Sequence, residues 1–220
     1  QPGNGYCLVL GAGNGRLLEE LILQTELNII AVEPDDQKVS RLRRHFDQAG
    51  VYGSRVVVLA GNPLKAELPA YLAELIVSAD LSVLGDLRNP ADWETLYRSL
   101  RPYGGQACLP LTDSNFDPLS QAVKQKLLPQ ANLERKSSWT LLTREGALPG
   151  SADWTHEYGD ASNTLMSHDE LVKAPLGVLW FGGPAGHGDL FYNRHDWGPS
   201  MAVIQGRMFL QGPGKLTAVD

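Results

Sequence analysis

Three glycines and one glutamate have the residue types and spacing that best fit a chemical task. Gly11, Gly13 and Gly15 stand at alternate positions directly after the apolar run Tyr6–Leu10, and Glu33 ends the next apolar run. Glycine has no Cβ and adopts positive φ easily, so a ligand can approach the backbone of such a turn closely. A carboxylate at the tip of the neighbouring strand can accept both hydroxyls of a ribose. The pattern therefore predicts a nucleotide site.

The elements that must position these residues can be read from the same stretch. Leu17, Leu18, Leu21 and Ile22 recur at helical spacing between the glycines and the second apolar run. The order is strand, glycine turn, helix and strand, and doubly wound α/β domains bind nucleotides where these strands end. The first N–H groups of the helix would face the ligand. A tight glycine turn without a ligand is the structural alternative.

The glycine spacing narrows the kind of nucleotide. A dinucleotide site follows G-x-G-x-x-G, whereas this chain has G-x-G-x-G with Arg16 where the third glycine is expected. No G-K-[ST] follows, so a P-loop is excluded. The LGAGNG turn and the acid that ends the second strand resemble the class I S-adenosylmethionine-dependent methyltransferases. This resemblance covers the domain that we expect over residues 1–146.

Two later segments support the same resemblance. LRPYGGQACLPL is similar to the LxPGG turn that leads into strand 5 of these enzymes, with Tyr103 inserted before the glycines. Ala131–Ser137 and Ser138–Glu145 predict a closing antiparallel hairpin. The expected fold is α/β, a doubly wound seven-stranded sheet of order 3-2-1-4-5-7-6, with right-handed crossovers and a β-rich, partly irregular C-terminal extension.

The resemblance implies S-adenosyl-L-methionine as the cofactor. Glu33 would hold the ribose hydroxyls, and Asn62 would line the adenine together with Ala60 and Gly61. The whole expected cofactor set is Gly11, Ala12, Gly13, Asn14, Gly15, Glu33, Pro34, Gly61, Asn62 and Ser78. A turn role for Asn62 is the alternative. Two departures from the family pattern are Val9, where an acid often precedes the glycines, and Asn62, which replaces the usual acid.

The loop after the fourth strand should face the transferred methyl group, because ligands of open α/β sheets bind at the carboxyl ends of the strands. Ser78 and Asp80 are the catalytic candidates in this loop. Helix capping or a turn is the alternative role for both. The loop has no NPPY-like segment, so it is not typical of amide or base nitrogen methylation.

Further elements follow from apolar periodicity and capping residues. The expected helices and strands are a helix that Asp35 or Asp36 caps and Gly50 ends, a strand over Arg55–Gly61, a short helix over Leu64–Leu75, a strand near Glu74–Ser78, a helix from Asn89-Pro90, and a helix from Asp117-Pro118 to Leu128-Pro129. In the last of these helices, Leu119, Val123 and Leu127 are expected to face inward.

Composition limits the partners. The chain has 220 residues, a net charge of −6 and no dense basic stripe, which argues against a nucleic-acid partner and gives no reason to expect a membrane partner. No apolar run approaches the ~20 residues of a membrane helix. Cys7 and Cys108 lie in apolar runs and predict buried thiols without a disulfide. The chain starts without methionine or a signal peptide, which suggests a piece of a longer polypeptide.

The character of the chain changes at Gly146. Residues 147–220 are rich in Gly, Pro, Asp, His and Trp, with short strands expected at Leu176–Phe181, Met201–Ile204, Arg207–Leu210 and Leu216–Val219. DWTHEYGDASNTLMS, LGVLWFGGP and VIQGRMFLQGPGKLTAVD resemble the opening of a pyrroloquinoline-quinone-type β-propeller. A propeller needs several blades, so exposed strand edges could pair with the rest of a propeller or with another chain.

The histidines of this extension raise the question of a metal site. His156, His168, His187 and His195 stand near Asp160, Asp169, Asp189 and Asp196. No two histidines have the i, i+4 spacing of a helical zinc motif. No metal is therefore expected, and quinone binding is not expected either.

The first functional hypothesis is an S-adenosylmethionine-dependent methyltransferase that transfers the methyl group directly to a small-molecule acceptor. The main alternative is a methyltransferase fold retained as a non-catalytic binding or scaffolding module. A nicotinamide-dependent oxidoreductase is disfavoured by Arg16, and a propeller-based binding or redox protein is a further alternative. The cofactor favours the cytoplasm, whereas quinone-type propellers usually work outside it.

Overall fold

The computed structural model describes residues 5–177, 201–212 and 214–219. The chain divides into two compact units, Gln1–Glu145 and Gly146–Asp220, which are described separately. The elements of the first unit are β1 (Tyr6–Leu10), α1 (Arg16–Gln24), β2 (Asn28–Glu33), α2 (Asp36–Gln48), β3 (Val56–Ala60), β4 (Ala73–Val77), a 3-10 turn η1 (Leu81–Leu84), α3 (Pro90–Ser99), β5 (Gly105–Leu109), α4 (Asp113–Lys124), β6 (Ala131–Lys136) and β7 (Trp139–Arg144).

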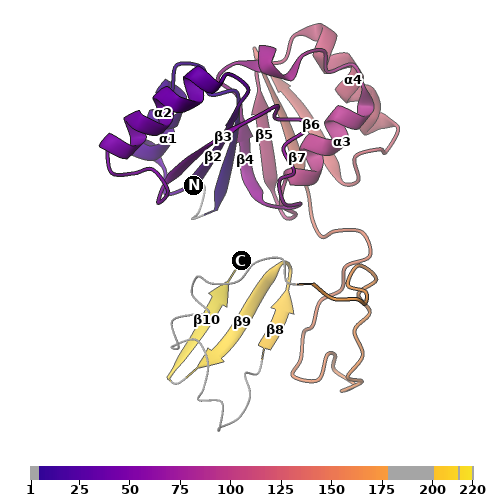
Figure 1. The fold of residues 1–220 in the computed structure, drawn as a ribbon. Coiled ribbons are helices and arrows are strands. Elements are labelled where there is room, and N and C mark those ends of the chain that lie inside the picture. Colours follow the sequence, from indigo (N-terminus) through magenta and orange to yellow (C-terminus); the bar gives the residue numbers. More distant parts are fainter. Residues whose placement is uncertain (1–4, 178–200, 213, 220) are drawn as a thin grey trace. The chain divides into compact units, whose positions relative to one another are not determined.

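The first unit is built on one seven-stranded sheet in the order β3-β2-β1-β4-β5-β7-β6. Strands β1 to β5 pair in parallel, and β7 runs antiparallel to both β5 and β6. Figure 1 shows this sheet edge-on between its helices. The predicted fold class and strand order are confirmed, including the closing hairpin of β6 and β7.

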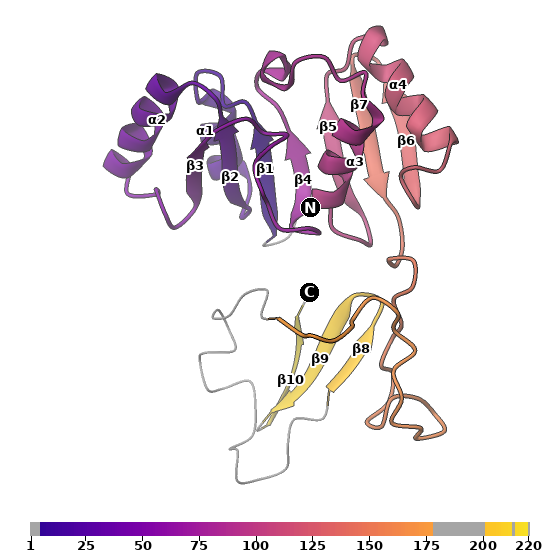
Figure 2. The same ribbon diagram turned by 45° about the vertical axis from the view of Figure 1, so that its right-hand side comes forward.

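Two apolar cores lie on the two faces of the sheet. Leu18 from α1 and Leu42 and Phe46 from α2 are buried with one set of strand residues. Trp93 from α3 and Leu119 from α4 are buried with the other set. Figure 2 shows α1 and α2 on one side of the strands and α3 and α4 on the other. This doubly wound arrangement leaves the carboxyl ends of β1, β2 and β4 free to form a site.

The helix predicted over Leu64–Leu75 is wrong. The chain makes one turn after Asn62 and then runs extended into β4. Pro69 lacks the N–H that a helix needs at its centre, and Tyr71 has a φ of +63°, which helices exclude. Leu64 and Leu68 still pack against the core that α3 and α4 cover. The apolar residues of this segment therefore do face the core, but from an extended chain and not from a helix.

The helix predicted from Asp117-Pro118 begins earlier and ends earlier. It starts at Asp113 and ends at Lys124, so Pro118 lies inside it. Pro118 is the sixth of the twelve residues of α4, and proline removes one backbone hydrogen bond there. Leu119 is buried as expected and Val123 is partly buried, but Leu127 is 40% exposed, and Leu128 packs into the core in its place.

The second unit contains a three-stranded antiparallel sheet, β10-β9-β8. Its strands are β8 (Met201–Ile204), β9 (Arg207–Gly212) and β10 (Lys215–Val219), which confirms three of the predicted strands. Gln205 and Gly206 form the β8–β9 turn, both with positive φ. Leu176 and Gly177 lie outside any strand, and the remainder of the predicted strand Leu176–Phe181 lies outside the described residues.

A propeller blade has four strands, and the described part of this unit has three, so the propeller resemblance gains no support from the fold. Between 146 and 177 the chain consists mainly of turns and extended segments. Asp169, for example, accepts hydrogen bonds from the N–H groups of Leu171 and Val172. The unit is therefore β-rich and partly irregular, as predicted.

The described residues contain no group of three or more His, Cys, Asp or Glu side chains that could hold a metal. His187, His195, Asp189 and Asp196 lie outside them. Within the same ranges, no helix is long and apolar enough to cross a bilayer.

The two thiols are free, and burial should make Cys7 inert. Desolvation raises the pKa of Cys7 to about 12 and also raises the pKa of Cys108. Because the thiolate is the reactive form, we expect Cys7 in the folded chain to resist a thiol-specific disulfide reagent at mildly alkaline pH. Both thiols should react at once in denaturant. Rapid labelling of Cys7 before unfolding, located by peptide mass, would contradict its burial.

Candidate functional site

The glycine turn connects β1 to α1 with a backbone that only glycine adopts easily. Gly11, Gly13 and Gly15 have φ values of +73°, +56° and +95°, in the region that disfavours a Cβ. A Cβ on Gly11 would lie 2.5 Å from the backbone oxygen of Asp80, and one on Gly15 would lie 2.5 Å from Cδ2 of Leu42. The glycines thus serve close packing as well as the shape of the turn.

Hydrogen bonds connect this turn to the strands on both sides. The N–H of Gly11 donates to the carbonyl of Val32 at 2.9 Å, and the N–H of Ala79 donates to the carbonyl of Gly11 at 3.2 Å. The hydroxyl of Ser78 donates to the carbonyl of Leu10 at 2.5 Å. The ends of β1, β2 and β4 are therefore held together as one surface, with the glycine turn at its centre.

Glu33 lies at the end of β2 and is fully buried, with 0% of its surface exposed. Its Oε2 accepts a hydrogen bond from the N–H of Ala12 at 2.9 Å, and its Oε1 accepts one from the N–H of Asp35 at 3.2 Å. The ammonium of Lys38 lies 3.6 Å from Oε1. The predicted ribose acceptor therefore fixes the glycine turn to the start of α2.

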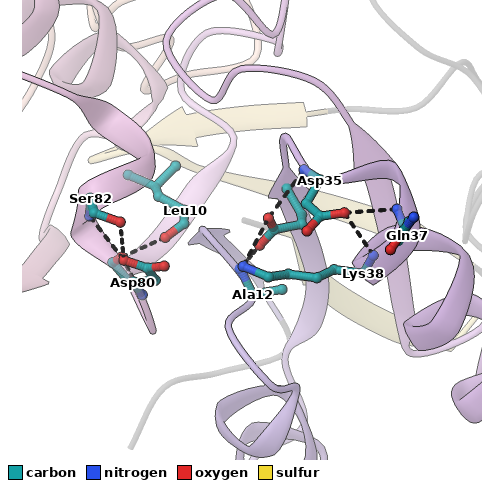
Figure 3. Close-up of polar contacts among 9 residues, drawn as sticks. Leu10, Ala12, Asp35, Gln37, Lys38, Asp80 and Ser82 are labelled. Carbon is teal, nitrogen blue, oxygen red and sulfur yellow. Dashed lines mark hydrogen bonds and ion pairs between the residues drawn. The ribbon is translucent and has the colours of Figure 1, made fainter.

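The start of α2 places Lys38 over this carboxylate. Asp35 caps the helix, since its side chain accepts hydrogen bonds from the N–H groups of Gln37 and Lys38, which confirms one of the two predicted caps. Figure 3 shows the Lys38 side chain extended from α2 toward Ala12. A carboxylate has about four lone-pair positions. Two N–H groups and one ammonium already use part of that capacity.

Asp80 lies across the glycine turn from Glu33, at the start of η1. Its side chain accepts hydrogen bonds from the N–H and the hydroxyl of Ser82 (Figure 3). Those two bonds, with a smaller contribution from the charge of Lys38, lower the pKa of Asp80. Asp80 is therefore a carboxylate at neutral pH. A carboxyl with a lowered pKa is a weak general base.

The other expected residues take the following places. Asn14 and Pro34 are exposed, and Gly61 is partly exposed at the tip of β3. The N–H of Gly61 donates to the backbone carbonyl of Glu33 at 3.1 Å, so the tip of β3 lies beside the end of β2. The side-chain oxygen of Asn14 accepts from the N–H of Arg16 at 3.1 Å. The side-chain oxygen of Asn62 accepts from the N–H of Leu64 at 2.8 Å.

The structure thus brings the glycine turn, Glu33, Gly61 and the loop of Ser78 and Asp80 to one edge of the sheet. Ser78 and Asn62 use polar atoms within the protein, so their contact with a cofactor stays a prediction. The sequence analysis missed Lys38. Its position could have been predicted, because Lys38 lies in the first turn of the helix that Asp35 caps and precedes the buried residue Val39.

Sheet order, alternate-glycine turn and the acid at the tip of β2 define the class I methyltransferase type of fold. A scan against family models and a search of curated proteins gave no match. Among solved structures, the chain is similar to an assigned S-adenosyl-L-methionine-dependent methyltransferase from Methanococcus maripaludis, with 15% identity and a TM-score of 0.56 over 67% of this chain and 80% of that one.

A second similar structure is the [4+2]-cyclase SpnF, with 13% identity and a TM-score of 0.50 over 60% of this chain. The match spans 54% of the cyclase, so this chain corresponds to about half of that protein. Both similarities concern the fold. The cyclase is described by a different reaction from that of the methyltransferase, so the reaction must be argued from the site.

Proposed function

We propose that the first unit binds S-adenosyl-L-methionine and transfers its methyl group to a small-molecule acceptor. The observation that carries the proposal is the Glu33 carboxylate at the tip of β2, adjoining a turn whose glycines keep the backbone free of side chains. The residues fit a ribose-bearing cofactor, because a carboxylate accepts hydroxyl protons and the α1 N-terminus carries no side-chain cap bond of its own at Gly15.

When bound, the cofactor supplies an electrophilic sulfonium methyl group. The chain would contribute the cofactor's alignment through Glu33 and the glycine turn, and alignment can lower a barrier by roughly 7–11 kcal/mol. The hydroxyl of Ser78 braces β4 against the carbonyl of Leu10, so we assign it to positioning the loop. Asp80 stays ionised and contributes negative charge at the same edge. Gly61 and Asn62 would line the adenine.

The second candidate function is a binding or scaffolding module without catalysis. The observation that favours it is that Glu33 has a structural task, since its side chain accepts hydrogen bonds from the N–H groups of Ala12 and Asp35. An intact glutamate is therefore compatible with a fold that has lost its cofactor. In that case the β strands of the second unit would pair with strands of a partner chain or with the rest of a propeller.

The experiment that tests the proposal is calorimetric titration of the chain with S-adenosylhomocysteine, the product-like cofactor. We expect saturable binding in the micromolar range, and adenosine should bind more weakly because it lacks the amino-acid end. Isotope-labelled S-adenosylmethionine offered with a panel of small acceptors then identifies the transfer. A folded chain that binds neither cofactor form would overturn the proposal and favour the scaffold.

A further inference from the structure

Glu33 is fully buried, so ribose hydroxyls can reach its carboxylate only after the carboxylate becomes accessible. Its exposed fraction is 0%, and its three polar partners are the N–H of Ala12, the N–H of Asp35 and the ammonium of Lys38. A ligand can reach Glu33 only if part of this cover moves. The nature of the three partners decides which part that is.

Two of the partners are fixed by the backbone. Ala12 belongs to the glycine turn, which is hydrogen-bonded to the end of β2 through Gly11 and to the β4 loop through Ala79. Asp35 is the cap of α2 and is held by its own bonds to the first turn of that helix. Moving either group would break several hydrogen bonds at once. Neither is a plausible moving part of the cover.

Lys38 is the partner that can leave. Its side chain is 31% exposed, and it meets Glu33 through one ion pair of 3.6 Å, a distance longer than a short charge-assisted hydrogen bond. A lysine side chain has a flexible four-carbon stem and a strongly hydrated head group. Rotation about that stem would transfer the ammonium into water while the backbone of the site stays in place.

The charge of Lys38 affects other groups of the site in addition to Glu33. Its ammonium contributes to the electrostatic environment of Asp80 on the opposite side of the glycine turn. The cofactor whose ribose Glu33 would hold carries a positively charged sulfonium, and like charges repel. Lys38 therefore opposes a cationic cofactor more than a neutral one.

We propose that Lys38 is a gate over Glu33: its ammonium occupies the ribose-facing side of the carboxylate, and cofactor binding displaces it. The inference rests on the proposed function, since the displacing group is the ribose diol. It makes Lys38 a residue that determines cofactor affinity and the preference between the sulfonium and its neutral thioether product. It predicts that removal of the Lys38 ammonium improves binding of the cofactor.

The test compares the full chain with Lys38→Met, which keeps the length of the stem and removes the charge, and with Lys38→Arg, which keeps the charge. Lys124→Met on the exposed end of α4 is the matched control for net charge. Calorimetric titrations with S-adenosylhomocysteine and S-adenosylmethionine are accompanied by thermal unfolding. Glu33 is wild type in every variant, so each one retains the ribose acceptor.

For Lys38→Met we expect a Kd for S-adenosylhomocysteine lowered by roughly fivefold, the change that corresponds to a release of about 1 kcal/mol, and a larger gain for S-adenosylmethionine. The melting temperature of the same variant should fall slightly, because the ion pair is lost. Lys38→Arg and Lys124→Met should stay within about twofold of wild type. Tighter binding by a slightly less stable variant is a result that a purely structural role of Lys38 would not give.

The remaining outcomes separate the gate from the proposed function. If wild type binds and Lys38→Met binds equally or more weakly, the gate is overturned and the cofactor assignment stands. If wild type binds and Lys38→Met binds several-fold more tightly while Lys38→Arg and Lys124→Met do not, the gate is supported. If neither binds, both the gate and the cofactor assignment fail, because uncovering Glu33 did not open a ribose site.

Discussion

Replacing Gly11 by alanine is expected to lower the free energy of unfolding of the first unit by about 3 kcal/mol. A left-handed backbone costs an L-residue roughly 1–2 kcal/mol, and Gly11 has a φ of +73°. The added Cβ would also lie 2.5 Å from the backbone oxygen of Asp80 and 2.8 Å from Cγ2 of Val83. Since a backbone oxygen cannot rotate away, the β4 loop would have to shift.

The control is Gly53→Ala, because Gly53 has a similar φ of +82° and nothing within 4 Å of its Cβ position. This variant should lose only about 1 kcal/mol, the cost of the backbone conformation. Urea unfolding followed by the helical circular dichroism signal measures both, because the helices of the described residues lie in the first unit. Equal losses would show that the glycine turn is not packed against Asp80.

Much of the fold could be predicted because its signals are local. Glycines at alternate positions, the acid that ends β2, the Asn89-Pro90 start of α3 and the final hairpin each determine one element. Chain order then limits how these elements combine into a sheet. The segments that failed contain proline. Pro69 prevents the helix expected before β4, and Pro118 suggested a helix start although it lies within the first half of α4.

The candidate site could be predicted only in outline. The sequence places Glu33 at a strand tip, but it cannot reveal that the carboxylate is covered, because that depends on contacts between residues distant in sequence such as Ala12 and Glu33. The same holds for Ser78, whose hydroxyl bonds to Leu10 on another strand. Asn62 and Asn14 carry side chains that satisfy nearby N–H groups, a local role that is common for asparagine in turns.

The burial of Glu33 changes how its presence bears on function. From the sequence, an intact acid argues for a working cofactor site. In the structure the same acid accepts hydrogen bonds from two backbone N–H groups, so it also has a structural role. The similarity to a cyclase as well as to a methyltransferase has the same consequence, because a shared fold does not fix the reaction. Variants that separate the structural role of Glu33 from a role in binding ribose can decide whether the site binds the cofactor.

Glu33→Gln and Glu33→Ala are expected to separate those tasks. Hydrogen bonds to a charged group contribute about 1.5–3 kcal/mol, so loss of the carboxylate should weaken S-adenosylhomocysteine binding by about 2 kcal/mol, close to thirtyfold. Glutamine keeps one acceptor oxygen for Ala12 but turns an NH₂ group toward the N–H of Asp35. Alanine leaves both N–H groups without the side-chain acceptor and should destabilise the unit most, by about 3 kcal/mol.

Glu19→Gln provides the matched control, since it changes the net charge equally at an exposed residue that is hydrogen-bonded to His45. It should leave binding unchanged and alter stability by less than about 0.5 kcal/mol. Titration and urea unfolding are measured on all four proteins. If the Glu33 variants lose stability and wild type binds no cofactor, Glu33 has only a structural role. If Glu33→Gln binds as tightly as wild type, the ribose lies elsewhere. Weaker binding by a still-folded Glu33→Gln assigns both tasks to one carboxylate.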